Sequence, residues 1–425
     1  MNTILKSFFF IVFSLLQFTS LAESQALKDV RNSIDLARGH EGPYIFSDPS
    51  FTNAPAGYKA FYISHYGRHG ARYAWAKETY EIVRDVLHNA HQAKALTPQG
   101  EKLLAAYEEF YPIPMDDFGA LVPQGAQQLY SLGEEMYKNF PEVLGGKSIV
   151  HAASSPYNRV IMSMTSFCNA LIKCNTDMQL TQTAYHSEQV ITRATPVEPL
   201  PLVFYERGKR SQKMEDYHSF LRRTVDVDGI LSRLIKQKSV YQDRMEKEEF
   251  FLALYDLWSG YRNYTDKMFL DDVFTVDERV KVWEAVNYRD YKFANERFRN
   301  DVAPTVVDIV KKADAVISGK SNHSADLRFG HDFVIYSLLM FLDINNFGVM
   351  PSVPEDMKNM FQNYKIPMAS NLQFIFYRNN QKDVIFKLIY NGKEAIIGGV
   401  KPVEGPFYRW NEFRDVAIKL ASQPK

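Results

Sequence analysis

Residues 58–73 hold the stretch that decides the fold, YKAFYISHYGRHGARY. Its first part, Tyr58–Ser64, is rich in aromatic residues and is typical of a strand. Its second part, His65–Gly70, is interrupted by two glycines and predicts a loop. Together they predict a strand that ends at a loop, in which one imidazole lies between the guanidinium groups of Arg68 and Arg72.

The loop after this strand has the composition of a phosphate-binding site. Guanidinium groups bind phosphate oxygens in a bidentate manner, and the glycines permit a ligand to approach the backbone closely. An imidazole between arginines can attack phosphorus, because the arginines reduce the repulsion between the nucleophile and the anion. In α/β proteins, ligands bind at the carboxyl ends of strands, where this loop is expected.

The string Arg68-His-Gly-Ala-Arg-Tyr73 resembles the signature of the histidine phosphatase superfamily, in the acid phosphatase and phytase branch that includes multiple inositol polyphosphate phosphatases. Two further matches follow downstream, His151-Ala-Ala-Ser-Ser-Pro-Tyr-Asn-Arg159 and Phe329-Gly-His331-Asp332. Residues 121–133 resemble the helix opening usual between the first two motifs. The order and spacing of these segments agree with the family across most of the chain after residue 22.

The resemblance implies a phosphomonoester hydrolase that acts on small-molecule phosphate esters with neither a metal nor another cofactor. His69 would attack phosphorus and become a phosphohistidine, and Asp332 would protonate the leaving oxygen and then activate water. The groups implied to bind the phosphate oxygens are Arg68, Arg72, Arg159 and His331. The alternative is a catalytically silent phosphate- or polyanion-binding protein on the same fold, although a silent member is expected to have lost His69 or Asp332.

Two positions depart from the inositol polyphosphate phosphatases. Asp332 follows His331 where some of them carry His-Ala-Glu, and Ala74 stands where a proline is common among them. The first departure favours the simpler acid phosphatase or phytase type, and the core motif does not identify the substrate. A basic run follows the proline-rich linker 195–201, with residues Arg207, Lys209, Arg210 and Lys213. It is predicted either to line the substrate cleft, where Arg207, Lys209 and Arg210 would bind a polyphosphate such as phytate, or to be the solvated start of a helix.

Strand and helix signals alternate along the chain, which predicts an α/β fold with a mostly parallel sheet flanked by helices. Residues 23–205 and 321–425 are predicted to form the catalytic core, and residues 206–320 a mainly helical insertion. Asn371–Arg378 and Asp383–Tyr390 alternate apolar and polar residues and predict two paired antiparallel strands.

Residues 1–22 are predicted to be a signal peptide. Lys6 precedes a short apolar run, and the small residues Ser20 and Ala22 predict cleavage after Ala22. The alternative is a membrane anchor, for which the run is short of the ~20 residues that a spanning helix needs. The protein is therefore expected to be exported, to the periplasm or the medium, with no stable membrane insertion after cleavage.

Charge and cysteine content exclude other classes of protein. Fifty Lys and Arg balance fifty Asp and Glu, so no global positive field attracts nucleic acid. Cys168 and Cys174 would lie about 9 Å apart in one helix, beyond disulfide reach, which predicts free thiols unless the helix ends between them. His65 and His69 have the spacing of metal ligands on a helix, but the neighbouring glycines and arginines argue against a metal. The sequence does not indicate an oligomeric state.

Overall fold

The computed structural model describes residues 23–423 except residues 48, 194–214, 296–298, 350 and 352. Three predictions fall outside the described residues: the signal peptide at 1–22, the linker at 195–201, and the basic run of Arg207, Lys209, Arg210 and Lys213.

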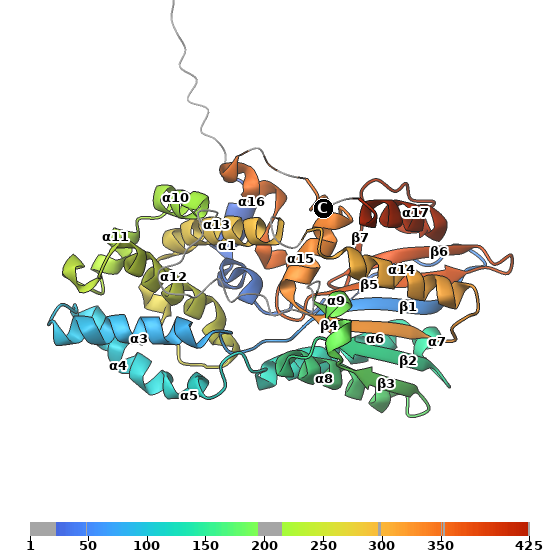
Figure 1. The fold of residues 1–425 in the computed structure, drawn as a ribbon, viewed down its shortest axis with the longest axis horizontal. Helices are drawn as coiled ribbons and strands as arrows, with labels where there is room; N and C mark the ends of the chain where they lie inside the picture. The colour runs from blue at the N-terminus through green and yellow to red at the C-terminus, as the bar shows by residue number, and fades with distance from the viewer. Residues whose placement is uncertain are drawn as a thin grey trace, which may run out of the picture.

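One mixed sheet forms the centre of the larger lobe (Figure 1). Within the described residues its strand order is β3-β2-β4-β1-β5-β6-β7, and β8 pairs with β6. The strands are β1 (Lys59–Arg68), β2 (Ile149–Ser154), β3 (Gln179–Thr183), β4 (Ala325–Gly330), β5 (Asn371–Arg378), β6 (Val384–Tyr390), β7 (Lys393–Ala395) and β8 (Phe407–Arg409).

The sheet is parallel on one side of β1 and antiparallel on the other. β1 pairs in parallel with β4, β4 with β2, and β2 with β3. On the other side β1 pairs antiparallel with β5, β5 with β6, and β6 with β7 and β8. The predicted α/β fold is confirmed, as is the antiparallel pair β5–β6. The sheet is nevertheless mixed rather than mostly parallel, because short connections reverse the chain between β5 and β7, whereas the parallel strands are joined through helices.

Helices cover both faces of the sheet (Figure 1). α6 and α8 pack together on one face, and α14 packs against α17 on the other. Successive side chains of β1 pack on opposite faces of the sheet, since Tyr62 and Ile63 belong to different apolar cores. The helices of this lobe are α6 (Pro123–Asn139), α7 (Pro141–Leu144), α8 (Asn158–Cys174), α9 (Gln189–Thr192), α14 (Ala303–Ile317), α15 (Asp332–Phe341) and α17 (Trp410–Ala421).

A helical lobe adjoins the sheet at the left of Figure 1. The predicted insertion of residues 206–320 contributes α10 to α13 to the helical lobe. The lobe also contains α3 to α5, which lie before residue 206 in the chain. α14 lies within residues 206–320 but packs on α17 and β1 of the sheet lobe. The helices of the helical lobe are α1 (Gln25–Asn32), α2 (Ile34–Ala37), α3 (Lys77–Gln92), α4 (Pro98–Phe110), α5 (Pro112–Met115), α10 (Glu215–Thr224), α11 (Val227–Ser232), α12 (Arg244–Gly260), α13 (Val276–Phe293) and α16 (Met357–Met360).

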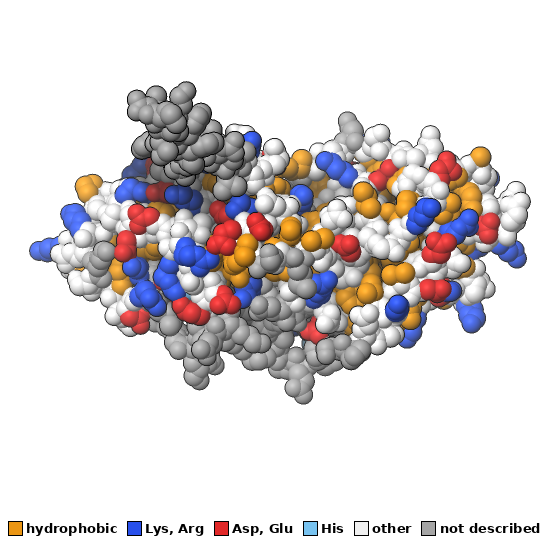
Figure 2. Space-filling view, turned by 90° about the horizontal axis from the view of Figure 1, so that it is seen from above, with side chains coloured by type: hydrophobic (Ala, Val, Ile, Leu, Met, Phe, Trp, Pro, Cys, Tyr) orange, Lys and Arg blue, Asp and Glu red, His pale blue; other side chains and the backbone are white. Residues whose placement is uncertain are grey.

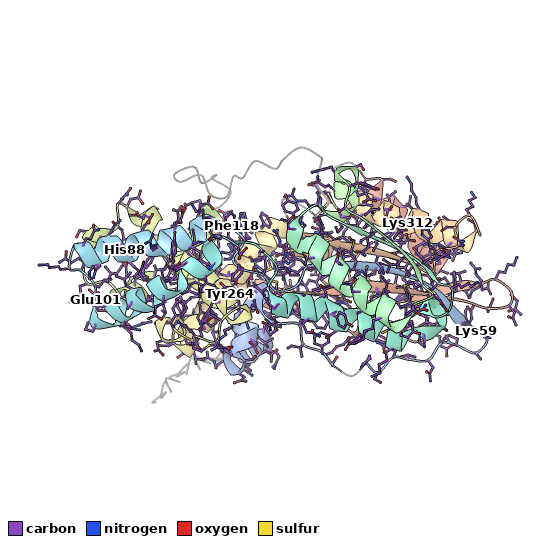
Figure 3. All side chains as sticks on the ribbon, turned by 90° about the horizontal axis from the view of Figure 1, so that it is seen from below. Lys59, His88, Glu101, Phe118, Tyr264 and Lys312 are labelled. Atoms are coloured by element: carbon purple, nitrogen blue, oxygen red, sulfur yellow. The ribbon has the colours of Figure 1, made fainter. Side chains whose placement is uncertain are left out.

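The carboxyl ends of the parallel strands face the helical lobe. Lys59, which begins β1, lies at the end of the molecule opposite to His88 and Glu101 of the helical lobe (Figure 3). β1 therefore runs toward the helical lobe, and β2 and β4 run with it because they are parallel in register. The residues that follow these three strands consequently lie where the two lobes meet.

Three smaller features bear on the predictions. Cys168 and Cys174 both lie in α8 and are free thiols, as predicted. On the face shown in Figure 2, acidic and basic side chains are interspersed without a large patch of one sign. Among the described residues, no helix combines the length and the apolar character needed to cross a membrane.

Candidate active site

The carboxyl ends of β1, β4 and β2 bring the three sequence motifs together. At the end of β1, Arg68 is in register with Gly330 of β4. The N–H of His69 donates to the carbonyl of Gly330 at 3.0 Å, and the N–H of Ser155 donates to the carbonyl of Phe329 at 3.1 Å. The loops that follow these three neighbouring strands therefore adjoin at one edge of the sheet.

His69 is buried and held in one orientation. Its Nδ1 lies 2.9 Å from the carbonyl oxygen of Gly70. Since a carbonyl oxygen only accepts, Nδ1 must carry the hydrogen, and in the neutral ring Nε2 keeps its lone pair. Burial, followed by the charges of Arg159, Arg68 and Arg72, holds the pKa of His69 well below its usual value. The ring is therefore neutral near neutral pH.

The loop after β1 is packed tightly against α6 and α8. A Cβ on Gly70 would lie 2.3 Å from the carbonyl oxygen of Gly125 at the start of α6, so only glycine fits. The N–H of Gly70 donates to Oγ of Ser163 at 3.1 Å, and the N–H of Ala71 donates to Oε1 of Gln128 at 2.9 Å. Two helices thereby fix the backbone on which His69 and Arg72 are carried.

Arg68 and Arg72 are both buried, and each is held by several acceptors. Nη1 of Arg68 donates to the carbonyl of Ile366 at 3.1 Å, and its Nη2 donates to Oδ2 of Asp332 at 3.1 Å. Nη2 of Arg72 donates to Oε1 of Glu41 at 2.8 Å. The two guanidinium groups are thus fixed before any substrate arrives, which reduces the entropy lost on binding.

Arg159 lies in the first turn of α8, and its guanidinium is 5.2 Å from the ring centroid of Tyr157. Burial, followed by repulsion from Arg72, lowers the pKa of Arg159 to about 9. The effect of Arg72 means that the two cations are crowded together, and an anion between them would relieve the repulsion.

Seven arginines among the described residues have a buried Nε without a hydrogen-bond partner. Four of them interact with the charges of this site, namely Arg68, Arg72, Arg159 and Arg193, and the other three are Arg262, Arg279 and Arg378. A buried donor without a partner costs about 1–3 kcal/mol, and such groups are rare in folded proteins. Several of them around one imidazole suit a site that binds an anion.

His331 is the N-cap residue of α15, directly after β4. Its Nε2 lies 3.0 Å from Oγ of Ser155, and its ring is 5.8 Å from the ring of His69, centroid to centroid. Burial, followed by the charge of Arg159, holds the pKa of His331 well below its usual value. The two imidazoles thus lie close together at this edge of the sheet.

Asp332 is the first residue of α15 and its side chain is 21% exposed. Oδ1 accepts the N–H of Phe333 at 2.8 Å, and Oδ2 accepts from Arg68. Burial raises the pKa of this carboxyl, but Arg68, His40 and other cations outweigh burial and lower it to about 2. Without substrate, Asp332 is therefore a carboxylate at mildly acid pH.

The sequence reasoning missed several contributors besides His40, two of which interact with residues of the predicted site. Arg193, the C-cap residue of α9, lies with its guanidinium 4.8 Å from the ring centroid of Tyr157, on which Arg159 also lies. Glu41 reaches Arg72 from a segment that precedes β1. Neither belongs to a motif or a periodic pattern, so no signal in one sequence could have found them.

All six residues of the predicted core site lie at this edge of the sheet: Arg68, His69, Arg72, Arg159, His331 and Asp332. The described residues contain no group of three or more His, Cys, Asp or Glu side chains arranged as metal ligands would be.

Comparison with solved structures shows the same fold elsewhere. The multiple inositol polyphosphate phosphatase of Bifidobacterium longum, in complex with inositol hexasulfate, has a TM-score of 0.69 and 16% identity over 90% of this chain and 97% of its own. The phytase from D. castellii has a TM-score of 0.61 and 14% identity over 92% of this chain and 86% of its own. A comparison with curated proteins found no match.

A family comparison identifies the chain more directly. The sequence profile of the histidine phosphatase superfamily (branch 2) matches residues 67–391, which include every motif that meets at the edge of the sheet. The chain therefore belongs to branch 2 of the histidine phosphatase superfamily and is a phosphomonoester hydrolase.

Proposed function

We propose that the chain is an exported histidine acid phosphatase that works through a phosphohistidine at His69. One observation carries the proposal. Nδ1 of His69 is committed to the carbonyl of Gly70, which leaves Nε2 as the unprotonated nitrogen of a ring beside Arg68, Arg72 and Arg159. A neutral imidazole of fixed orientation among cations meets the requirements for attack on a phosphate anion.

In the first half-reaction, Nε2 of His69 forms a bond to phosphorus while the bond from phosphorus to the ester oxygen breaks. The transition state spreads negative charge over the three other phosphate oxygens, so the fixed cations supply most of the stabilisation. The guanidinium groups of Arg68, Arg72 and Arg159, and the His331 imidazole, are the proposed ligands of those oxygens. The leaving oxygen takes a proton from Asp332.

Asp332 must be protonated to act as this acid. The low pKa in the free enzyme is set by cations, with Arg68 and His40 the largest contributors after burial. A bound phosphate dianion offsets these cations and raises the pKa of Asp332 again. Substrate binding thus helps to create the acid, and activity is expected to be greatest at mildly acid pH.

In the second half-reaction, the Asp332 carboxylate takes a proton from water as the water oxygen attacks phosphorus. The bond between phosphorus and Nε2 breaks, inorganic phosphate leaves, and His69 and the protonated Asp332 are restored. One carboxyl group therefore serves as acid and then as base, in accordance with microscopic reversibility.

Inositol polyphosphates are the proposed substrate class. Arg193 adds a fourth guanidinium next to the three of the motifs, which is more positive charge than a single monoester needs. Arg207, Lys209 and Arg210 are proposed to add to it, although they lie outside the described residues. The two structures reported above are named as an inositol polyphosphate phosphatase and a phytase. Export is proposed from the leader at residues 1–22 alone.

A substrate panel tests this proposal. Phosphate release should be measured at mildly acid pH from inositol hexakisphosphate, glucose phosphates and p-nitrophenyl phosphate, with and without EDTA. We expect turnover that resists EDTA and favours inositol hexakisphosphate. Loss of activity in EDTA would point to a metal enzyme instead.

The covalent intermediate needs its own measurement. A rapid alkaline quench during turnover, followed by mass spectrometry, should find a phosphoryl group on the peptide that contains His69. His69→Ala should lose turnover by ~10³-fold or more while still binding inorganic phosphate. A His69→Ala variant that keeps most of its turnover, or wild-type protein that binds phosphate esters without hydrolysing them, would contradict the proposal.

A further inference from the structure

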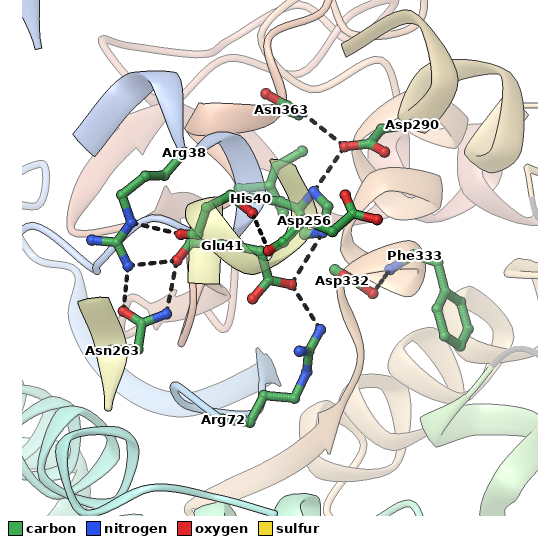
Figure 4. Close-up of polar contacts among 12 residues, drawn as sticks. Arg38, His40, Glu41, Arg72, Asp256, Asn263, Asp290, Asp332, Phe333 and Asn363 are labelled. Atoms are coloured by element: carbon green, nitrogen blue, oxygen red, sulfur yellow. Dashed lines mark hydrogen bonds and ion pairs between the residues drawn. The ribbon is translucent and has the colours of Figure 1, made fainter. Parts of the chain in front are cut away.

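A segment that precedes β1 contributes a largely buried chain of ion pairs to the site (Figure 4). The segment is the 3₁₀ turn η1 (Gly39–Glu41), and the His40 side chain lies between two carboxylates. Nδ1 of His40 is 2.8 Å from Oδ2 of Asp290, and Nε2 is 3.3 Å from Oε1 of Glu41. Because both ring nitrogens face acceptors that carry no hydrogen, both are donors and the ring is an imidazolium.

Glu41 connects this imidazolium to Arg72. The carboxylate oxygen of Glu41 that faces His40 also accepts a hydrogen bond from Nη2 of Arg72 at 2.8 Å. Nη1 of Arg72 donates to the carbonyl of Tyr73 at 3.1 Å, which leaves the buried Nε as the donor without a partner among the described residues. The signs alternate along Asp290, His40, Glu41 and Arg72, so each buried charge is stabilised by its neighbours.

The same segment reaches the second half of the site through Arg68. Nη1 of Arg68 donates to the backbone carbonyl of His40 at 2.5 Å, and Nη2 donates to the carboxylate of Asp332 at 3.1 Å. One guanidinium thus bridges His40 and Asp332. The segment therefore contacts the two arginines that flank His69.

The helical lobe holds this segment in place. Asp290 belongs to α13 and also accepts a hydrogen bond from Nδ2 of Asn363 at 2.8 Å. Oδ1 of Asn363 in turn accepts a hydrogen bond from Nε1 of Trp283 at 2.8 Å. Gly39 has a φ of +58°, and a Cβ there would lie 2.7 Å from Nδ2 of Asn363. The close approach and the left-handed backbone both require glycine, and together they place His40 against α13.

We propose that His40 and Glu41 are positioning residues for phosphoryl transfer, Glu41 by orienting the guanidinium of Arg72 and His40 by placing a permanent positive charge beside Asp332. The inference rests on the function proposed above. Neither residue is proposed to touch the phosphate. The helical lobe thereby takes part in the chemistry of the sheet lobe, since α13 supplies the carboxylate that keeps His40 charged.

The charges support this assignment. Burial lowers the pKa of His40, but Asp290 and Glu41 outweigh burial and raise it to about 10. The ring therefore stays charged at any acid or neutral pH. The charged or titratable groups that interact with His40 are Asp256, Asp290, Glu41, Asp332 and Tyr336. Those that interact with Asp332 are Arg68, Arg72, Arg159, His40, His331, Tyr66 and Tyr336.

The pH dependence of kcat tests the proposal, because kcat falls as pH rises when Asp332 loses its proton in the enzyme–substrate complex. His40→Gln removes a positive charge from beside Asp332 and should move this alkaline limb to higher pH, by about half a unit or more. Glu41→Gln removes a negative charge and should move it to lower pH. Opposite shifts from adjacent residues would not follow from loss of stability.

A double-mutant cycle tests the role of Glu41 through Arg72. Glu41→Gln alone should lower kcat by about tenfold or more while inorganic phosphate binds no more weakly, since removing a carboxylate does not reduce the attraction for an anion. In an Arg72→Met background the same substitution should change kcat by less than about twofold, because its target is gone. Additive losses would overturn the positioning role.

A matched control separates chemistry from folding. His218 and Glu248 form another buried pair between α10 and α12, with Nδ1 and Oε2 2.8 Å apart. His218→Gln should lower the melting temperature without moving the alkaline limb. If His40→Gln fails to fold, Glu41→Gln still tests the proposal, because the glutamine side chain has the same shape as the glutamate that it replaces.

The outcomes distinguish the two proposals. Suppose that the wild-type enzyme forms a phosphohistidine at His69. If the alkaline limb of the kcat–pH profile then stays in place in His40→Gln and Glu41→Gln, or moves in the same direction in both, the positioning role alone is overturned. Wild-type protein without a phosphohistidine at His69 would instead overturn the proposed function on which the inference rests.

Discussion

Arg68 and Asp332 are in contact although 264 positions separate them in the chain, with Nη2 and Oδ2 3.1 Å apart. The parallel register of β1 and β4 brings them together, since Arg68 ends β1 opposite Gly330. Arg68 is fully buried, whereas Asp332 is partly exposed. The arginine thus holds a carboxylate that is partly open to solvent, at the position where we propose that the leaving group departs.

Asp332→Asn should affect substrates according to their leaving groups. An alkoxide such as that of inositol or glucose needs a proton, so kcat for those phosphates should fall by ~10²–10⁴-fold. p-Nitrophenolate leaves without a proton, so kcat for its ester should fall much less. Steady-state kinetics on both substrates checks this. An identical loss on both would argue against Asp332 as the acid.

Arg159→Met should stabilise the free protein while it weakens phosphate binding. The pKa of Arg159 is lowered to about 9 because burial and Arg72 oppose its charge, so the charge costs stability in the absence of an anion. We expect the melting temperature without phosphate to rise by about 1–3 °C and the further rise on adding phosphate to shrink. Thermal unfolding with and without inorganic phosphate measures both, and a fall in stability without phosphate would contradict the crowding of cations.

Arg193→Met should discriminate between substrates by their charge. Its guanidinium lies over Tyr157 beside Arg159, and not in the motif that is proposed to bind the transferred phosphate. kcat/KM for inositol hexakisphosphate should fall about tenfold or more, as expected for loss of one charge-assisted contact, with a smaller change for p-nitrophenyl phosphate. Lys173→Met, which removes an exposed cation over Tyr130, serves as the control. Equal effects on the two substrates would assign Arg193 to the transferred phosphate.

Joint neutralisation of Arg207, Lys209 and Arg210 to Gln tests the predicted substrate cleft. If these side chains bind the outer phosphates of a polyanion, KM for inositol hexakisphosphate should rise several-fold at low salt, and the increase should shrink at high salt because ions screen the attraction. KM for p-nitrophenyl phosphate should stay constant. The same change in KM for both substrates would favour a solvated helix start instead.

Local patterns in the sequence were enough to propose the residues of the core site and to predict several strands. Glycines in the sequence predicted the loop after β1, although β1 continues to Arg68 and the loop begins later than His65. The capping box at Thr275 and the Thr97-Pro98 helix start are read from adjacent residues, and each is found in the structure. Periodicity likewise predicted the hairpin of β5 and β6. These features depend on short-range sterics and hydrogen bonds, which a few neighbouring residues determine.

Tertiary structure alone decided which charges meet. The pairing of Glu41 with Arg72, the imidazolium of His40 between Glu41 and Asp290, and the place of Arg193 beside Arg159 join segments with no shared pattern. The parallel order β2-β4-β1 likewise comes from packing of helices on the sheet, and not from any one strand. Electrostatic contacts between distant segments have no periodicity and leave no local mark in the sequence, so the motif residues could be named from the sequence while the groups that orient them could not.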